Sequence, residues 1–247
     1  MEKGIRTVGF MVLVSAIFIA VLATVNAMTK ARIEQNFEIE RAKSILYAFN
    51  IFPEGIKETD FSLTSPTAAI PWKQDQILQV QSQIKKVSLP IPEQLQDALK
   101  GSFLDGKTSI EIFERRNEKG ELLAYGLPLY GKGLWGSIEG FGVISADLTR
   151  MVGIDFLKQS ETPGLGARIM EKEYKYFFRN LDLSGFYKSD TGQTPIIMVK
   201  QKETTNVDAS TNSVQAITGA TLTSQGVLDM VNSNIALYLK IIQATKT

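Results

Sequence analysis

The sequence predicts an α+β domain, an antiparallel-rich sheet with flanking helices, preceded by one N-terminal transmembrane helix. Three observations predict this class. Thr7–Met28 is a run of 22 residues without a charged side chain. Several short β-rich segments separated by turn residues follow between Ser109 and Val199. Apolar residues then recur at helical spacings of three and four over Thr223–Ile242. Strands gathered in one part of a chain, with helices beside them, are typical of the α+β class.

The run Thr7–Met28 is long enough to cross a bilayer, because a helix of this length spans roughly 33 Å. A cleaved signal peptide is the alternative, with Val25-Asn26-Ala27 as its cleavage site. The run is longer than the roughly 7–15 apolar residues of a signal core, which favours the membrane helix. Two basic residues flank each end of the run, so the positive charges on its two sides are nearly equal. The additional charge of the amino terminus favours a cytoplasmic location for residues 1–6.

Residues 29–101 are predicted as a helical stalk and connector, and residues 102–247 as the folded domain. Within the stalk, Ala31–Phe49 continues the membrane helix as an amphipathic helix. Gln74–Lys86 is predicted as a short helix or connector, and Glu93–Lys100 as one more short helix.

The folded domain is predicted to hold five strands and two helices. The last strand is continuous in apolar residues and is therefore expected at the centre of the sheet. The strands are Ser109–Arg115, Leu122–Leu129, Phe141–Ala146, Val152–Leu157 and Ile196–Val199, and the helices are Lys172–Phe178 and Thr223–Ile242.

The composition excludes several classes of function. The chain has no cysteine and no histidine, which excludes disulfides, cysteine-ligated iron–sulfur clusters and the usual zinc and haem sites. It also excludes flavin attachment through either side chain. A net charge of +1 without a basic block gives no support to nucleic-acid binding. An electron carrier in this chain is therefore expected to be organic and to be tethered through a hydroxyl group.

The segment Ile217–Val227 presents hydroxyl groups where the last helix is predicted to begin. Thr218-Gly219-Ala220 leads to Thr221, and glycine permits the close backbone approach that a phosphate needs. The free backbone N–H groups of a helix N-terminus favour an anion. The segment is thus typical of a phosphate site, although an ordinary N-cap has the same composition.

Two glycine-rich loops lie between the predicted strands. Tyr130–Gly136 joins one strand pair, and Glu161–Gly166 follows another strand. Such loops permit positive φ angles and close approach to a flat ligand. Both are also compatible with plain turns, with Trp135 as a core residue.

The three segments together resemble the FMN-binding domains of NqrC, a component of the Na+-translocating NADH:quinone reductase, and of RnfG, its relative in the Rnf complex. Thr218–Ser224 resembles the flavinylation motif, whose last threonine, here Thr221, is esterified to the phosphate of FMN. Gly-Leu-Trp at 133–135 is similar to NqrC, and Glu-Thr-Pro-Gly-Leu-Gly at 161–166 is similar to both. One position departs from the motif, because Gln215 stands where the family usually has aspartate.

The resemblance implies a set of cofactor-binding residues and neither a catalytic acid–base pair nor a metal site. A lysine after the last strand would stabilise reduced, anionic flavin, and Arg168 is a second candidate for this role. The implied residues are Thr221 as the covalent attachment site, with Thr218, Gly219, Ala220, Leu222, Thr223, Glu161, Thr162, Leu165, Gly166, Trp135 and Lys200.

The resemblance implies a single-pass subunit of the cytoplasmic (inner) membrane, with its flavin domain on the extracytoplasmic side. It would carry electrons within an NqrC-like NADH:quinone reductase, without activity alone, and would need a flavin transferase for maturation. An RnfG-like subunit of a ferredoxin:NAD Rnf complex is the alternative. A membrane-anchored binding or assembly module without flavin is an alternative of another class, and a stand-alone surface flavoprotein is a third.

Overall fold

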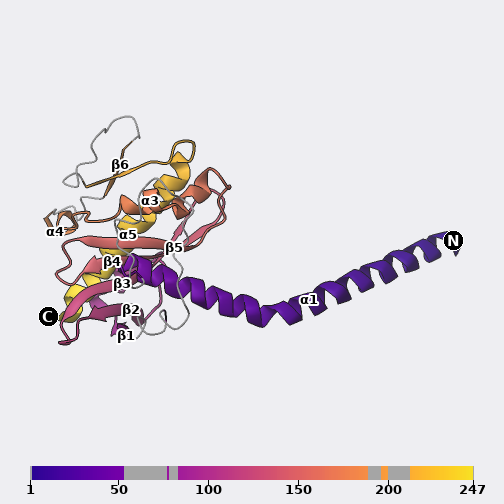
Figure 1. Ribbon diagram of the computed structural model, residues 1–247, viewed down its shortest axis with the longest axis horizontal. Helices are drawn as coiled ribbons and strands as arrows, with labels where there is room; N and C mark the ends of the chain where they lie inside the picture. Colours follow the sequence, from indigo (N-terminus) through magenta and orange to yellow (C-terminus); the bar gives the residue numbers. More distant parts are fainter. Residues whose placement is uncertain (1, 53–76, 78–82, 189–195, 200–211, 247) are drawn as a thin grey trace. The chain divides into compact units, whose positions relative to one another are not determined.

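The computed structural model describes residues 2–52, 77, 83–188, 196–199 and 212–246. The chain forms two compact units, Met1–Arg41 and Ala42–Thr247. The predicted ligand Lys200 lies outside the described residues. The predicted fold class is confirmed, with an apolar N-terminal helix, an antiparallel five-stranded sheet and a C-terminal helix (Figure 1).

The first helix, α1, covers Glu2–Ala48 and joins the two predicted helices into one. Its segment Gly4–Ala48 is long and apolar enough to cross a membrane. The hydroxyl group of Thr24 donates to the carbonyl of Ala20, and that of Thr29 donates to Val25. These bonds satisfy the polar side chains inside the helix, as an apolar surrounding requires.

The main sheet has the order β1-β2-β3-β4-β5, with every neighbouring pair antiparallel. Four of its strands were predicted from the sequence with small differences at their ends. The segment Gln74–Lys86, predicted as a short helix or connector, differs at its C-terminal end, because Ile84–Lys86 already belong to a strand that pairs with β2. The strands are β1 (Ile84–Pro90), β2 (Ser109–Arg116), β3 (Leu122–Lys132), β4 (Ser137–Ser145) and β5 (Met151–Lys158).

The predicted central strand is not in this sheet. β6 (Ile197–Val199) instead pairs in parallel with β7 (Ser213–Gln215), a strand that the sequence did not reveal. The continuous apolar residues of Ile196–Val199 predicted a strand buried on both faces, but Ile197 is 53% exposed. The buried Ile196 makes its two backbone hydrogen bonds with the side chain of Asn232 rather than with a strand.

The shorter helices follow the prediction in part. The predicted helix Glu93–Lys100 is two separate 3-10 turns, and the predicted helix Lys172–Phe178 is shorter than expected. The helix at the C-terminal end is longer than predicted and begins at Thr221. The elements are η2 (Glu93–Leu95), η3 (Asp97–Leu99), η4 (Gly166–Met170), α3 (Lys172–Tyr176), α4 (Gly185–Lys188) and α5 (Thr221–Lys246).

Helix α5 packs on one face of the sheet and is fixed to β3 by polar as well as apolar contacts. The amide group of Asn234 accepts from the N–H of Tyr130 and donates to its carbonyl. The hydroxyl group of Tyr238 donates to the carbonyl of Pro128. A Cβ on Gly131 would lie 2.5 Å from the Cβ of Met230, so only glycine allows the helix this close. These contacts set the position of Thr221 at the start of α5.

The end of α1 packs on the other face of the sheet. Phe49 and Phe141 stack obliquely with ring centroids 6.0 Å apart, over Gly126. Asn50 ends the helix with φ 55° and donates from its side chain to the carbonyl of Val152 on β5. The folded unit therefore includes the last turns of α1 and strand β1, both of which precede residue 102.

Asp155 on β5 links this face to α3. Its carboxylate, 2% exposed, pairs with Lys175 and accepts a hydrogen bond from the Ser44 side chain of α1. Burial raises the pKa of Asp155, an effect larger than the opposing one of Lys175 and the hydrogen bonds. The folded state consequently holds this proton to a higher pH than the unfolded state does.

We expect the pH dependence of stability to change in Asp155→Asn. Because the pKa is higher in the folded state, the contribution of Asp155 to the free energy of unfolding is greatest below about pH 4. This contribution is lost as the pH rises through the folded-state pKa. The free energy of unfolding of the Asn variant, measured with urea at each pH, should not show this decrease. Asp147→Asn is the control with the opposite sign, since Ser145 and Thr149 lower the pKa of Asp147. If the free energy of unfolding of Asp155→Asn depended on pH as that of the unmodified sequence does, the raised pKa of Asp155 would be contradicted.

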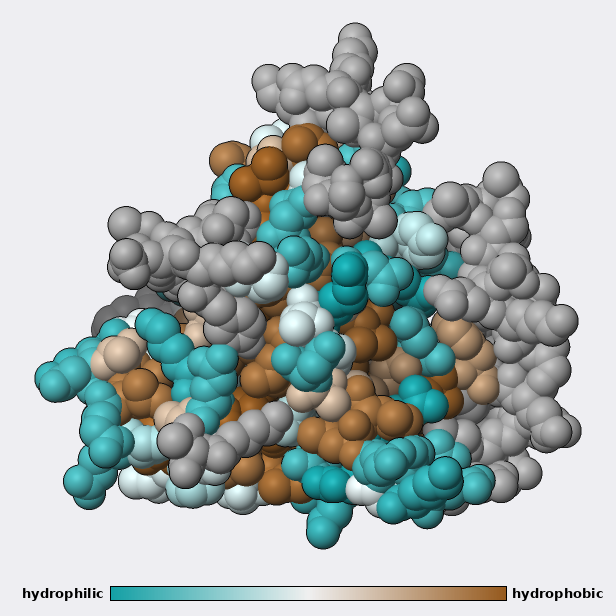
Figure 2. Space-filling view, turned by 90° about the vertical axis from the view of Figure 1, so that its left-hand side faces the viewer, coloured by the Kyte–Doolittle hydropathy of each residue, from teal (hydrophilic) through white to brown (hydrophobic). Residues whose placement is uncertain are grey.

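Exposed apolar side chains occur on several elements of the folded unit, such as Leu123 on β3, Tyr176 on α3 and Ile197 on β6. Figure 2 shows the side that faces left in Figure 1, where hydrophobic atoms reach the surface with hydrophilic atoms around them. Hydrophobicity alone therefore does not identify a site on this protein. The candidate site has to be recognised by its polar groups and by the loops that surround them.

Candidate flavin site

A buried carboxylate joins the three segments that the sequence singled out. Glu161 is 5% exposed and accepts a hydrogen bond from the Trp135 N–H at 2.9 Å. Its other oxygen accepts from the hydroxyl group of Thr223 at 2.5 Å. One side chain thus connects the β3–β4 loop, the loop after β5 and the first turn of α5. Glu161 and Thr223 were predicted as cofactor contacts, and the structure shows them buried within the wall of the site.

Glycines let these three segments approach one another. A Cβ on Gly166 would lie 2.6 Å from the Thr223 hydroxyl oxygen, and one on Gly133 would lie 2.3 Å from Glu161. A Cβ on Gly226 would lie 2.3 Å from the backbone oxygen of Lys132. A side chain at any of these positions would require movement of the backbone or of the Glu161 or Thr223 side chain. The glycine-rich loops are therefore more than plain turns, because each is in contact with a neighbouring segment.

The start of α5 presents an exposed hydroxyl group. Gly219 has φ 81°, a conformation that glycine adopts readily, and it turns the chain into the helix at Thr221. The hydroxyl group of Ser224 accepts from the N–H of Ile217 and donates to the carbonyl of Ala220. Ser224 thus makes the polar contacts of this turn. No residue in the described part of the chain hydrogen-bonds the side chain of Thr221, so Thr221 does not serve as an ordinary N-cap.

Exposed apolar side chains lie on the same three segments. Trp135 is 70% exposed, so the alternative that it is a core residue is wrong. Leu165 and Leu222 are 46% and 66% exposed, and Leu165 lies against Gly219. Large apolar groups at the surface beside a helix N-terminus suit a ligand with a flat apolar part and an anionic part.

The predicted cofactor residues divide into two groups. Thr218, Gly219, Thr221, Leu222, Thr162, Leu165 and Trp135 are exposed, whereas Ala220, Thr223, Glu161 and Gly166 are buried. Lys200, which follows β6, lies outside the described residues.

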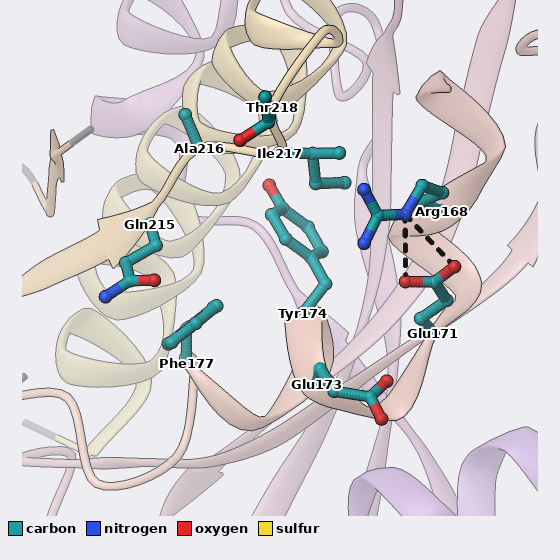
Figure 3. Close-up of a pocket in the computed structure, with 9 residues that line it drawn as sticks. All are labelled: Arg168, Glu171, Glu173, Tyr174, Phe177, Gln215, Ala216, Ile217 and Thr218. Atoms are coloured by element: carbon teal, nitrogen blue, oxygen red, sulfur yellow. Dashed lines mark hydrogen bonds and ion pairs between the residues drawn. The ribbon is translucent and has the colours of Figure 1, made fainter. Parts of the chain in front are cut away.

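A pocket of about 180 Å³ lies beside the exposed group and was not predicted. Helix α3 and η4 form one wall, and the segment from Gln215 to Thr218 forms the other (Figure 3). The sequence offered one signal for it, since Arg168 was already a candidate cation. The lining residues are Arg168, Glu171, Glu173, Tyr174, Phe177, Gln215, Ala216, Ile217 and Thr218.

Comparison with known proteins finds similarity to flavin-binding domains over these segments. Residues 133–236 match the family model of the FMN-binding domain. The chain is 34% identical over 123 residues to the C component of the Na+-translocating NADH-quinone reductase of Yersinia pestis, covering 50% of this chain and 44% of that protein. It is 28% identical over 131 residues to the G component of the ion-translocating oxidoreductase complex of Methanosarcina acetivorans, covering 53% and 60%.

Solved structures agree on the fold. The crystal structure of Shewanella oneidensis NqrC aligns with a TM-score of 0.62 at 16% identity, covering 86% of this chain and 99% of that one. The corresponding component of the Na+-translocating NADH-quinone reductase from Parabacteroides distasonis aligns with a TM-score of 0.59 at 21% identity, covering 86% and 96%. The chain spans less than half the length of the first curated relatives that it matches. The predicted resemblance to FMN-binding subunits of the NqrC and RnfG type is confirmed.

Proposed function

We propose that this protein is a membrane-anchored electron-transfer subunit that carries FMN covalently on Thr221. The observation that carries the proposal is the exposed Thr221 side chain, without a hydrogen-bonding partner among the described residues, at the first residue of α5. There the threonine oxygen would displace the leaving group at the phosphorus of an activated FMN donor, and the hydroxyl proton would depart with that group. A flavin transferase would catalyse this maturation step.

The described residues fit FMN at both of its ends. The backbone N–H groups that open α5 and the positive φ of Gly219 suit the phosphate. The exposed Trp135, Leu165 and Leu222 side chains offer apolar contact for the ring system. Thr218 and Thr162, both exposed, can bind polar parts of the same group.

The protein's own residues hold and orient the flavin, which when bound supplies the electron-carrying chemistry. Glu161, Thr223 and the packed glycines keep the three loops in place. The ester prevents loss of the cofactor by dissociation. Because the attachment is at the phosphate, the ring is tuned only by neighbouring side chains and backbone dipoles. Lys200 stays a predicted contributor to this tuning.

The apolar helix and the relatives support a place in a membrane complex. The relative from Yersinia pestis belongs to an NADH-quinone reductase, and the one from Methanosarcina acetivorans belongs to an ion-translocating oxidoreductase complex. We propose an NqrC-like role, with the flavin domain on the extracytoplasmic side and the other subunits of the complex as partners. Gly-Leu-Trp at 133–135 favours this over the RnfG-like alternative. The single apolar span has no charged residue, so ion translocation would occur in another subunit.

A second candidate is an assembly module that carries no flavin, which Gln215 in place of the usual aspartate favours. The intact mass of the chain purified from its own membranes separates the two. The covalent flavoprotein should weigh one FMN minus one water more than its polypeptide, with the adduct mapped to Thr221. A mass equal to the bare polypeptide would overturn the flavin proposal, and the subunits that co-purify would distinguish an Nqr complex from an Rnf complex.

A further inference from the structure

The carboxylate of Glu161 is a buried charge that forms no ion pair with any residue in the described part of the chain. The hydrogen bonds that it accepts come from two neutral groups, the Trp135 N–H and the Thr223 hydroxyl group. Each of its oxygens also packs against a glycine, since a Cβ on Gly133 would lie 2.3 Å from Oε1 and one on Gly166 would lie 2.7 Å from Oε2. Neutral groups therefore surround this charge on the sides that these contacts occupy.

The cations on the neighbouring segments are either paired or exposed to water. The Nε of Arg168 donates to both carboxylate oxygens of Glu171 at 3.1 Å (Figure 3). Lys158 at the end of β5 pairs with Glu139 at 3.3 Å. Lys132 at the end of β3 is exposed, so that water and salt screen its charge. The buried carboxylate thus remains an unbalanced negative charge among the described residues of these segments.

This charge lies close to the residues that are proposed to hold the flavin. Thr223, which donates to Glu161, is two residues after the proposed attachment site Thr221. Trp135 binds Glu161 through its backbone N–H, while its exposed side chain offers apolar contact for the ring. Because consecutive Cα atoms are about 3.8 Å apart, a group held at these residues lies on the order of 10 Å from the carboxylate. A buried charge acts over this distance, since the protein interior screens it less than water does.

We infer that the charge of Glu161 lowers the midpoint potential of the flavin and makes the reduced flavin a better electron donor to the next carrier of the complex. The inference rests on the proposed attachment of FMN at Thr221. Reduction brings an electron from a redox partner to the ring, and a negative charge nearby disfavours the negative charge that is added. Glu161 acts through space, so no bond to it forms or breaks. The predicted effect of Lys200 has the opposite sign, and the two residues would set the potential between them.

The test compares the flavin's midpoint potential in the full-length, flavin-loaded protein and its variants. Glu161→Gln removes the charge, but it keeps the size of the side chain and can keep both hydrogen bonds. At a fixed ambient potential it should raise the ratio of reduced to oxidised flavin about tenfold, which is a shift of about 59 mV for one electron. The difference should persist in high salt, because a buried charge is screened little. Intact mass shows whether each variant carries FMN.

Two further variants separate the charge from a structural disturbance. Thr223→Val removes one hydrogen bond to Glu161 and keeps the charge. It should lower the potential, because the O–H dipole no longer offsets the carboxylate, and it decides the question even if Glu161→Gln loads no flavin. Glu118→Gln is the matched control, since it makes the same chemical change at an exposed residue of the turn between β2 and β3. Its potential should equal that of the unmodified sequence.

The outcomes distinguish this inference from the proposed function. An equal or lower potential in Glu161→Gln, with FMN present by intact mass, would overturn the inference and leave the attachment at Thr221 standing. An equal or higher potential in Thr223→Val would also overturn it, as would a rise in Glu118→Gln as large as that in Glu161→Gln. Absence of FMN from the unmodified chain would overturn the proposed function and this inference with it.

Discussion

Thr221→Ala is expected to abolish covalent flavin attachment, with a loss of at least 100-fold in bound flavin per chain. The substitution removes the only oxygen that the proposed ester uses. The exposed position predicts a change in folding free energy within about 0.5 kcal/mol. Co-expression with a flavin transferase, followed by flavin fluorescence in a denaturing gel and by intact mass, measures the result. Thr221→Ser should retain attachment, since it keeps the hydroxyl group.

Thr223→Ala provides the complementary control. Thr223 is 1% exposed and its hydroxyl group donates to Glu161, so its loss should cost about 1–2 kcal/mol of stability. Flavin attachment through Thr221 should nevertheless persist in this variant. The two alanine variants thus separate the loss of the attachment site from the loss of stability. Persistent flavin fluorescence in Thr221→Ala, or its disappearance in Thr223→Ala alone, would show that Thr221 is not the attachment site.

Glu161→Ala is expected to have the largest effect on the stability of the folded unit. It removes two hydrogen bonds to a buried carboxylate and leaves the Trp135 N–H and the Thr223 hydroxyl group without their partner. Loss of such bonds costs about 3 kcal/mol, which lowers the melting temperature by about 6–12 °C for a domain of this size. Thermal unfolding of the full chain in detergent, followed by circular dichroism, measures this shift.

Glu161→Gln is the matched variant for this experiment. A glutamine can accept from the Trp135 N–H with its oxygen and donate to the Thr223 hydroxyl group with its nitrogen, if that hydroxyl rotates. We therefore expect a melting temperature close to that of the unmodified sequence. Equal losses in the alanine and glutamine variants would show that negative charge, rather than the two hydrogen bonds, holds the loops. An unchanged melting temperature in Glu161→Ala would refute the role of Glu161 altogether.

Local patterns were sufficient to predict most elements of the fold. The helical spacing after Thr223 and the alternation in Val152–Leu157 each reflect packing against one face, so they can be read from neighbouring residues. Strand β1 was missed because its existence depends on pairing with β2, which is distant in the sequence. Ile196–Val199 was misplaced because its pairing is supplied by Asn232 and by β7, neither of which leaves a local signal.

The site was predictable as a set of motifs but not as an arrangement. Thr221 at the start of a helix was correctly predicted from the sequence. The division between exposed Leu165 and buried Glu161 was not, because burial depends on which segments meet.

The contact between Gly226 and Lys132 has a consequence for how the protein behaves before its coenzyme arrives. Two stretches of main chain touch there with no intervening side chain, so neither can swing outward without the other losing its support. The β3–β4 loop and the start of α5 should therefore have their final conformation before the flavin is attached. A maturation enzyme would then bind a folded site rather than an unfolded segment. Rigid surroundings of this kind also suit a carrier whose charge changes while its neighbours stay still.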